Sequence, residues 1–270
     1  MNVAEELRKA RAGHYAIGAF NTNNLEVTKA ICKAASKYNM PILIQTTPSA
    51  LDYAGMKQLF DIVKNEIETT GIKAAVHIDH GKDVEKIKAA IEMGWPSVML
   101  DGSKLDFDEN VHLTHQIVTY AHARDVCVEA EIGVIGHEEG GMVSGTAVYS
   151  DPDEVKEFVE LTGVDSVAVS IGNEHGAPEG EKIKIDLLER IANMVDIPLV
   201  LHGSSGLSDG DIRSAMLHGV AKINIDTNIR KAFVREIESS KQEDYRDIFR
   251  DGMEEIEKVV DRYIRLFGNL

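Results

Sequence analysis

The chain is poor in cysteine, in basic residues and in long apolar runs, and each shortage excludes a class of protein. Among its 270 residues the two cysteines, Cys32 and Cys127, match no metal-binding or redox spacing, so we expect free buried thiols. Lysine and arginine number 29 against 45 acidic residues, and a net charge of −16 without a basic tract argues against nucleic acid or an anionic membrane as a partner. No apolar run reaches the ~18 residues of a membrane-spanning helix, and the N-terminus lacks the apolar core of a signal peptide. We therefore expect a cytoplasmic protein.

Linkers are missing as well, because no stretch rich in proline or serine divides the sequence. Short apolar runs instead alternate with longer segments of helical period, such as the helix face marked by Val27, Ile31, Ala34 and Tyr38. The expected strands are residues 16–21, 42–46, 74–79, 97–101, 127–131, 166–170, 199–202 and 222–225.

Eight strands, each followed by a helix, predict an α/β fold of the (β/α)8 TIM barrel type. The whole chain, 1–270, would form one catalytic barrel domain, and its length is near the ~250 residues typical of that fold. An open, doubly wound sheet is the alternative, because alternation of strands and helices does not reveal whether the sheet closes.

Polar side chains gather at the C-terminal ends of the expected strands. They are Asn21 at the first strand, Asp79 and His80 at the third, Asp101 at the fourth, Glu129 and Glu131 at the fifth, His175 after the sixth, His202 at the seventh, and 224–227 at the eighth. In a barrel all these positions converge on one mouth, where the active sites of this fold are built. This convergence predicts an enzyme.

Three of these residues are histidines. For any one of His80, His175 and His202 alone, a hydrogen-bonded loop residue is the simpler interpretation. Three neutral imidazoles at one rim, however, leave a coordination position open for substrate, which is what a catalytic zinc requires. We therefore expect one zinc ion per chain. His77, two residues before Asp79, is expected to face the barrel core in a packing role.

The carboxylates around the histidines suggest proton transfer and support for the metal. Asp79 directly precedes a metal-ligand candidate, so it can exchange a proton with a substrate hydroxyl. Asp101 and Glu131 either orient imidazole N–H groups or form an alternative metal position. For Glu131, binding of a backbone amide is an equally simple interpretation.

Long, glycine-containing connections complete the expected mouth. Residues 133–150 and 172–185 have the length and composition of lids or binding loops. The loops after the seventh and eighth strands lie where many barrels bind phosphate through backbone amides and a helix N-terminus. Their candidate phosphate-binding residues are Gly203, Ser204, Ser205, Gly206, Asp226 and Thr227.

Seven ordered segments resemble the class II, zinc-dependent fructose-bisphosphate and tagatose-bisphosphate aldolases. They are AFNTNNLE, VHIDHG, SVMLDGS, VEAEIG, AVSIGNEHG, PLVLHGSSGLSD and KINIDTN, which run through nearly the whole chain. The resemblance implies reversible aldol cleavage of a ketose bisphosphate to dihydroxyacetone phosphate and an aldehyde. Zinc, held by the three histidines, would act as the Lewis acid that stabilises the enediolate.

The resemblance also implies roles for individual residues. Asp79 would take the proton from the C4 hydroxyl, and Glu139, or its neighbour Glu138, would protonate C3. Asn21 and Asn224 would contact the ketose oxygens. The residues that would hold the C1 phosphate are Gly176, Gly203, Ser204, Asp226 and Thr227. A monovalent cation, Na+ or K+, lies nearby in some members, and members commonly form dimers or tetramers, so we expect a homo-oligomer.

The sequence departs from the family's pattern after His175. Many members have a tyrosine-lysine pair there, whereas this chain has Pro178 and Glu179, and a glutamate at that place would repel a phosphate. Lys182 or Lys184 are candidates to replace the missing lysine. Arg230 and Arg235 are candidates for the distal phosphate.

Three other functions are compatible with parts of the pattern. One is the same aldol chemistry on a different ketose phosphate or on a modified, unphosphorylated ketose. Another is a non-catalytic subunit of an aldolase complex, which would not need Asp79 and the three histidines. A metallohydrolase barrel would normally carry a His-x-His pair on an early strand, where this chain offers only Asn21.

Overall fold

The computed structural model describes residues 1–139, 142–144, 148–176, 180 and 182–270. Eight parallel strands close into a barrel in the order β1-β11-β10-β8-β5-β4-β3-β2. Closure of the sheet confirms the predicted (β/α)8 fold and excludes the open sheet. The barrel strands are β1 Ile17–Asn21, β2 Ile42–Thr46, β3 Ala74–Ile78, β4 Ser97–Leu100, β5 Cys127–Ile132, β8 Ser166–Val169, β10 Leu199–Leu201 and β11 Val220–Ile225.

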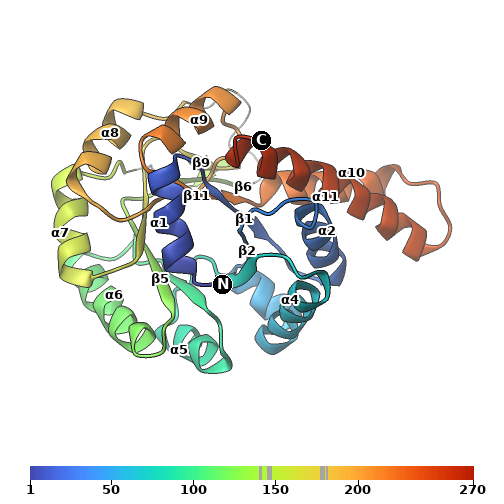
Figure 1. Cartoon of the computed structure of the whole chain (residues 1–270), viewed down its shortest axis with the longest axis horizontal. Helices are drawn as coiled ribbons and strands as arrows, with labels where there is room; N and C mark the ends of the chain where they lie inside the picture. The colour runs from blue at the N-terminus through green and yellow to red at the C-terminus, as the bar shows by residue number, and fades with distance from the viewer. Residues whose placement is uncertain (140–141, 145–147, 177–179, 181) are drawn as a thin grey trace.

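Helices surround the barrel on its outside (Figure 1). Several of their N-termini have side-chain caps, as in α2, where the Asn24 side chain accepts from the Val27 amide. The helices are α1 Val3–Gly13, α2 Leu25–Ala35, α3 Pro48–Ala54, α4 Met56–Thr70, α5 Val84–Met93, α6 Phe107–His122, α7 Pro152–Thr162, α8 Ile185–Met194, α9 Asp209–Leu217, α10 Thr227–Ser239 and α11 Tyr245–Phe267. No helix in the described part of the chain is long and apolar enough to cross a membrane.

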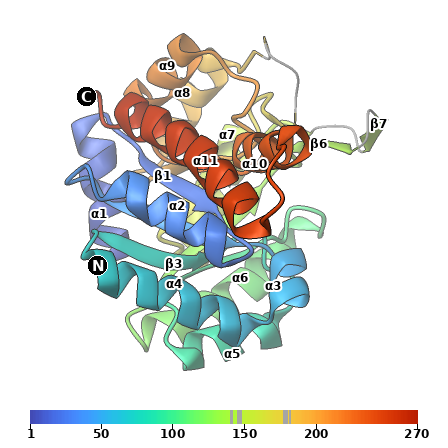
Figure 2. The ribbon, with the colours of Figure 1, turned by 90° about the vertical axis from the view of Figure 1, so that its right-hand side faces the viewer.

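The N-terminal end of the barrel is closed by α1, which lies in front of the strands in Figure 1. Val3, Leu7 and Ala10 of this helix pack against small and apolar residues that point into the barrel, among them Ala19 and Ala75. The far end of the molecule carries β6 and β7, which project beyond the barrel in Figure 2. One end of the barrel is therefore sealed and the other is available for a site.

A small second sheet lies at the open end and joins the two long connections. Its strands are β6 Gly136–Glu139, β7 Met142–Ser144 and β9 Glu174–His175, in the order β7-β6-β9. The parallel pairing of β6 with β9 sets His137 opposite His175. The two segments that the sequence predicted as separate loops are thus one structure, and their pairing fixes the backbone of His175.

Alternation along the strands decides which residues face the inside of the barrel. Successive side chains of a strand point to opposite faces, so Cys127, which packs in the inner cluster, shares its face with Glu129 and Glu131. On β3, Ala75 likewise shares its face with His77, and Asp79 continues the same alternation. The inner side chains thus change from apolar to charged between the N-terminal end and the mouth.

Candidate active site

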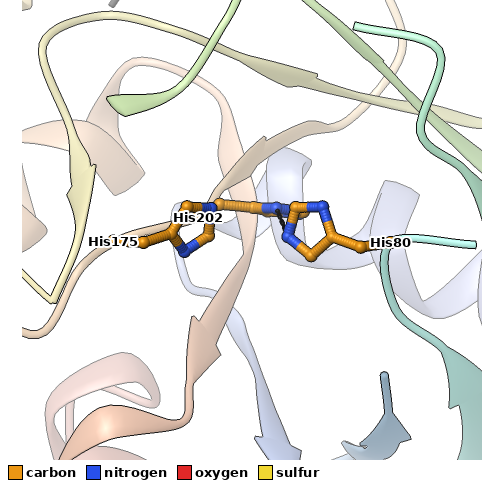
Figure 3. A group of neighbouring side chains, drawn as sticks. All are labelled: His80, His175 and His202. Atoms are coloured by element: carbon orange, nitrogen blue, oxygen red, sulfur yellow. Dashed lines mark hydrogen bonds between the residues drawn. The ribbon is translucent and has the colours of Figure 1, made fainter. Parts of the chain in front are cut away.

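Three imidazole rings meet at the C-terminal mouth of the barrel (Figure 3). His80 follows β3, His202 follows β10, and His175 ends β9. The ring centre of His80 lies 4.5 Å from that of His202 and 5.1 Å from that of His175, and the last two are 6.0 Å apart. One nitrogen from each ring lies within 4.8 Å of the others. A single ion can therefore contact all three histidines.

The carboxylates next to His80 and His202 determine where their protons lie. His80 Nδ1 is 3.1 Å from Asp101 Oδ2, and His202 Nε2 is 2.8 Å from Glu129 Oε1. A carboxylate can only accept a hydrogen bond, so in the neutral rings these nitrogens carry the protons. The opposite nitrogens, His80 Nε2 and His202 Nδ1, then face each other with lone pairs at 2.9 Å. Two acceptors at this distance require a cation beside them, either a proton or a metal ion.

An unpartnered carboxylate oxygen lies beside the same rings. Glu131 Oε2 is buried and has no hydrogen-bond partner among the described residues, and it lies 3.7 Å from His80 Nδ1 and 3.6 Å from His202 Nδ1. Burial, together with the negative charge of Asp101, raises the pKa of Glu131 to about 8. His80, Asp101 and Glu131 form a second group with metal-ligand spacing. The donor set, three imidazoles and a nearby unsatisfied carboxylate, fits a divalent metal such as zinc.

The carboxylates around His80 favour the protonated, positively charged form of its ring. Burial alone would favour the neutral ring, but Asp79, Asp101 and Glu131 raise the pKa of His80 to about 9. Its nitrogen Nε2 lies 3.9 Å from Asp79 Oδ1. The backbone at His80 is also unusual, since its φ of 52° lies in the left-handed region. In the absence of metal, a proton therefore supplies the positive charge between the rings.

Asp79 is held by three side-chain amides in the wall of the site. Asn21 Nδ2 donates to Oδ2 at 3.0 Å, Gln45 Nε2 donates to Oδ2 at 3.1 Å, and Asn224 Nδ2 donates to Oδ1 at 3.0 Å. Burial opposes the charged carboxylate, yet the neighbouring His80, His202 and Lys222 and the amide of Asn21 lower the pKa of Asp79 to about 2. The amides fix the carboxylate in its ionised form and in one orientation, as a proton acceptor beside His80 requires.

Beneath the histidines, the barrel interior contains a buried ion pair. Lys222 Nζ lies 2.7 Å from Glu129 Oε2, and the two side chains are 0% and 2% exposed. Burial raises the pKa of Glu129, but the attraction of Lys222 and the hydrogen bond from His202 outweigh it and hold that pKa below its usual range. His77 is fully buried, bonded to Ser97 Oγ at 2.8 Å, and its burial lowers its pKa to about 3. The predicted core position of His77 is confirmed.

The mouth opens into a cleft of about 1200 Å³. Asp79, His80, His175, Asp101 and Glu131 line it. So do most of the residues that the sequence suggested for substrate, namely Asn21, Gly176, Gly203, Ser204, Ser205, Asn224, Asp226 and Thr227, whereas Gly206 does not. This volume is somewhat above the roughly 300–1,000 Å³ of most small-molecule sites. The cleft therefore joins the histidine cluster to both loops that the sequence suggested for phosphate binding.

Within these loops some polar groups are already engaged. Ser204 Oγ donates to the Asn224 carbonyl at 2.8 Å, and Asp226 Oδ2 accepts from Arg230 Nε at 2.9 Å. Gly203 has a φ of 59°, and a Cβ there would lie 2.5 Å from the backbone of Glu174. Only glycine allows this close approach, which brings the β10–α9 loop against the strand that carries His175.

Other predicted residues are not brought to the histidines, or cannot be placed. The side chains of Glu138 and Glu139, and residues Pro178 and Glu179, lie outside the described part of the structure. Lys184 Nζ lies over the Tyr149 ring at 3.6 Å, and Lys182 is exposed. Arg230 lines the cleft, whereas Arg235 is exposed on α10 and does not.

Two residues of the site were missed by the sequence reasoning. Gln45 lies inside an apolar strand, and its role appears only when β1 and β2 pair Asn21 with Gln45. Lys222 begins the run KINI, whose pattern predicts a strand and no site residue. A lysine within an otherwise apolar β-strand was a signal, since a lysine is almost never fully buried without a partner.

The structure is a (β/α)8 barrel with histidines and acids in a cleft at its C-terminal mouth. Enzymes of this fold have their active sites at this mouth, which defines the protein as a barrel enzyme. The family model for class II fructose-bisphosphate aldolase matches residues 1–270, so the chain belongs to that family. The chain is thus an aldehyde-lyase whose family reaction is reversible aldol cleavage.

Individual relatives match over nearly their full length. The chain is 40% identical to the fructose-bisphosphate aldolase of Geobacillus stearothermophilus, covering 100% of this chain and 97% of that protein. It is 38% identical to the 6-phospho-5-dehydro-2-deoxy-D-gluconate aldolase of Halalkalibacterium halodurans, covering 99% and 96%. The crystal structure of the YdjI aldolase from Escherichia coli K12 superposes with a TM-score of 0.88 at 31% identity, covering 98% and 96%.

Proposed function

We propose that the chain is a zinc-dependent aldolase that cleaves a ketose bisphosphate, of the fructose- or tagatose-1,6-bisphosphate type, to dihydroxyacetone phosphate and an aldehyde. The observation that carries the metal is the convergence of His80, His175 and His202, which each bring one ring nitrogen within 4.8 Å of the others. His80, His175 and His202 would hold one zinc ion, with Asp101 and Glu131 as supporting or alternative ligands. When bound, zinc supplies the Lewis acidity that stabilises the negative charge left by carbon–carbon bond cleavage.

Asp79 is the proposed base for the C4 hydroxyl. Its carboxylate is buried, ionised and fixed by Asn21, Gln45 and Asn224, and it lines the cleft beside His80. A fixed acceptor needs little reorganisation when the proton moves. The charges of His80, His202 and Lys222 and the hydrogen bond from Asn21 lower the pKa of Asp79 to about 2, which keeps the carboxylate ionised and able to accept a proton near neutral pH.

The remaining roles follow the family pattern. Asn21 and Asn224 would contact the ketose oxygens, and Glu139 from the β6 segment would protonate C3. The C1 phosphate would lie at Gly176, Gly203, Ser204, Ser205, Asp226 and Thr227, where the loops meet the N-terminus of α10. We also propose that a Na+ or K+ ion binds near this phosphate. The protein would form a homodimer or homotetramer, lie in the cytoplasm and consist of a single domain over 1–270.

The second phosphate suits the positive side chains on the rim of the cleft. Lys82, Lys104, Arg230 and Lys231 line the cleft of an otherwise acidic protein. Such a rim favours an anionic group at the substrate's distal end over an unphosphorylated sugar. The relative named for 6-phospho-5-dehydro-2-deoxy-D-gluconate is nearly as similar as the fructose-bisphosphate aldolase, so a different ketose phosphate is the second candidate.

A cleavage screen across ketose phosphates, coupled to detection of dihydroxyacetone phosphate, tests the proposal. We expect release from at least one ketose bisphosphate, loss of release after chelation, and recovery with added zinc. The variant His202→Ala should lose both metal and activity, whereas a non-catalytic subunit would lose neither. No release from any phosphorylated ketose would overturn the substrate assignment.

A further inference from the structure

The buried ion pair beneath the histidines is not used by the proposed chemistry, although it touches a proposed metal ligand. Lys222 Nζ, Glu129 Oε2, Glu129 Oε1 and His202 Nε2 form a continuous chain with contacts of 2.7 Å and 2.8 Å at its two ends. Lys222, Glu129 and His202 are all buried. Three strands or strand ends, from β11, β5 and β10, supply the three side chains.

Such a chain is costly to bury, so its geometry is informative. A buried lysine and a buried glutamate are tolerated when they neutralise each other and their remaining polar atoms are bonded. Glu129 meets both conditions, because one oxygen contacts Lys222 and the other contacts His202. His77, whose Nε2 lies 3.8 Å from Glu129 Oε2 and 3.4 Å from Lys222 Nζ, completes the surroundings.

The direction of the bond to His202 follows from the charge of Glu129. A carboxylate beside an ammonium group stays ionised and can only accept, so the proton of the neutral His202 ring lies on Nε2. The ring's Nδ1 is then a lone pair, and it points at His80 Nε2 in the histidine cluster. A neutral amide in place of Glu129 could donate a hydrogen bond to Nε2 of His202. The proton of the His202 ring would then lie on Nδ1.

We propose that Lys222 and Glu129 are positioning residues that fix the tautomer of His202, so that Nδ1 faces the metal position as a lone pair. The inference rests on the proposed zinc site. Lys222 has no covalent role here. Its ammonium forms an ion pair with Glu129, and the Glu129 carboxylate accepts a hydrogen bond from the His202 ring. Hydrogen-bonded partners of this kind typically change metal affinity about 10–100-fold when they are lost.

The variant Glu129→Gln tests the proposal. In this variant the ammonium of Lys222 donates to the amide oxygen of the new glutamine, so the amide NH2 group faces His202 Nε2. Nε2 must then accept a hydrogen bond, and the proton of the His202 ring moves to Nδ1. Zinc affinity, measured by competition with a chelator, should fall about 10–100-fold. In the double variant Lys222→Met/Glu129→Gln no ammonium holds the amide oxygen, so the amide can turn and accept a hydrogen bond from His202 Nε2–H. Zinc affinity should therefore rise about tenfold above that of the single variant. Ser166→Ala, which lies beside Glu129 in the strand register, is the matched control and should bind zinc normally.

A direct readout is the 15N–1H NMR spectrum of the histidine rings in the zinc-free proteins. We expect the Nε2–H tautomer for His202 in the wild-type protein and in the double variant, and the Nδ1–H tautomer in Glu129→Gln. An Nδ1–H tautomer in the wild type would overturn the proposal, even if a variant does not fold. So would wild-type zinc affinity in Glu129→Gln, or a double variant as weak as the single one. Failure of the wild type to bind zinc at all would instead overturn the proposed function.

Discussion

The two ends of the barrel are built from the same strands but from different chemistry. At the N-terminal end, Leu7 of α1 and Ala75 of β3 belong to an apolar cluster that is nearly inaccessible to solvent. At the mouth, the continuing face of β3 carries Asp79, and that of β5 carries Glu131. The polar atoms Gln45 Oε1, Glu131 Oε2 and Asn224 Oδ1 have no hydrogen-bond partner there among the described residues.

This difference separates stability from function. Burying an unsatisfied polar group costs free energy, so the mouth is less favourable for folding than an apolar plug of the same shape. The closed end, by contrast, offers no polar group to a ligand. We expect substitutions at the mouth to act mainly on activity, and substitutions at the closed end to act on stability while the folded protein keeps its activity.

The largest expected effect is at the mouth, in Asp79→Asn. The amide keeps the shape of the side chain but cannot accept the C4 proton as a base, so kcat for cleavage should fall about 10³-fold. Zinc content should change little, whereas the free energy of unfolding should fall, because the new NH2 group faces side-chain amides that donated to the carboxylate, so kcat is measured on the folded protein. Asp52→Asn, on the exposed surface, is the control. A variant that cleaves within tenfold of the wild type would show that another group is the base.

At the closed end, Leu7→Ala should lower the free energy of unfolding by about 2–5 kcal/mol, because it opens a cavity where α1 meets the barrel. Thermal or denaturant unfolding measures this loss. The kcat of the folded fraction should remain that of the wild type. A fall in kcat beyond the unfolded fraction would mean that the two ends are coupled and that the separation does not hold.

The third effect is a pH dependence confined to the mouth. The pKa of His80, about 9, lies above its ordinary value of 6.5, so the native metal-free protein binds a proton that the unfolded chain has lost. Its stabilisation is complete below pH 6.5 and is lost as pH rises through 9. Glu131, with a pKa of about 8 against 4.5, acts in the same direction from pH 4.5 to 8.

Metal-free protein should therefore lose about 4–5 kcal/mol of stability between pH 6.5 and pH 9, with the two groups contributing similar amounts. Denaturant unfolding at a series of pH values measures this slope. His80→Gln should flatten the part of the slope above pH 8. A stability that rises over this range in the wild type would contradict the proposed charge state of the site.

The smallest expected effect is on the rim of the mouth. Lys231→Gln should raise KM for a ketose bisphosphate by about two- to fivefold, because an exposed charge contributes at most about 1 kcal/mol and is screened by salt. Lys57→Gln, on the remote α4, should leave KM unchanged. Equal KM values for Lys231→Gln and the wild type at low salt would remove Lys231 from the distal phosphate site.

Much of the fold was predictable because its signals are local. Each barrel strand begins and ends within two residues of its predicted bounds, and the alternation of apolar runs with helical segments sufficed for this. The convergence of His80, His175 and His202 followed from one topological rule, that strand ends of a barrel share a mouth.

The rest depends on contacts between segments that the sequence does not pair. Gln45 contacts Asp79 only because β1, β2 and β3 are neighbours in register. Lys222 and Glu129 meet across the interior of the closed barrel, and no spacing in the sequence relates them. The pairing of β6 with β9 joins segments more than thirty residues apart, so two predicted loops became one sheet.

X-ray absorption spectroscopy of the zinc-loaded protein tests the metal centre most directly. We expect one zinc per chain with three imidazole nitrogens at about 2.0–2.1 Å, and loss of one imidazole shell or of the metal in His175→Ala. A spectrum with fewer than two imidazoles, or with a sulfur ligand, would contradict the proposed centre.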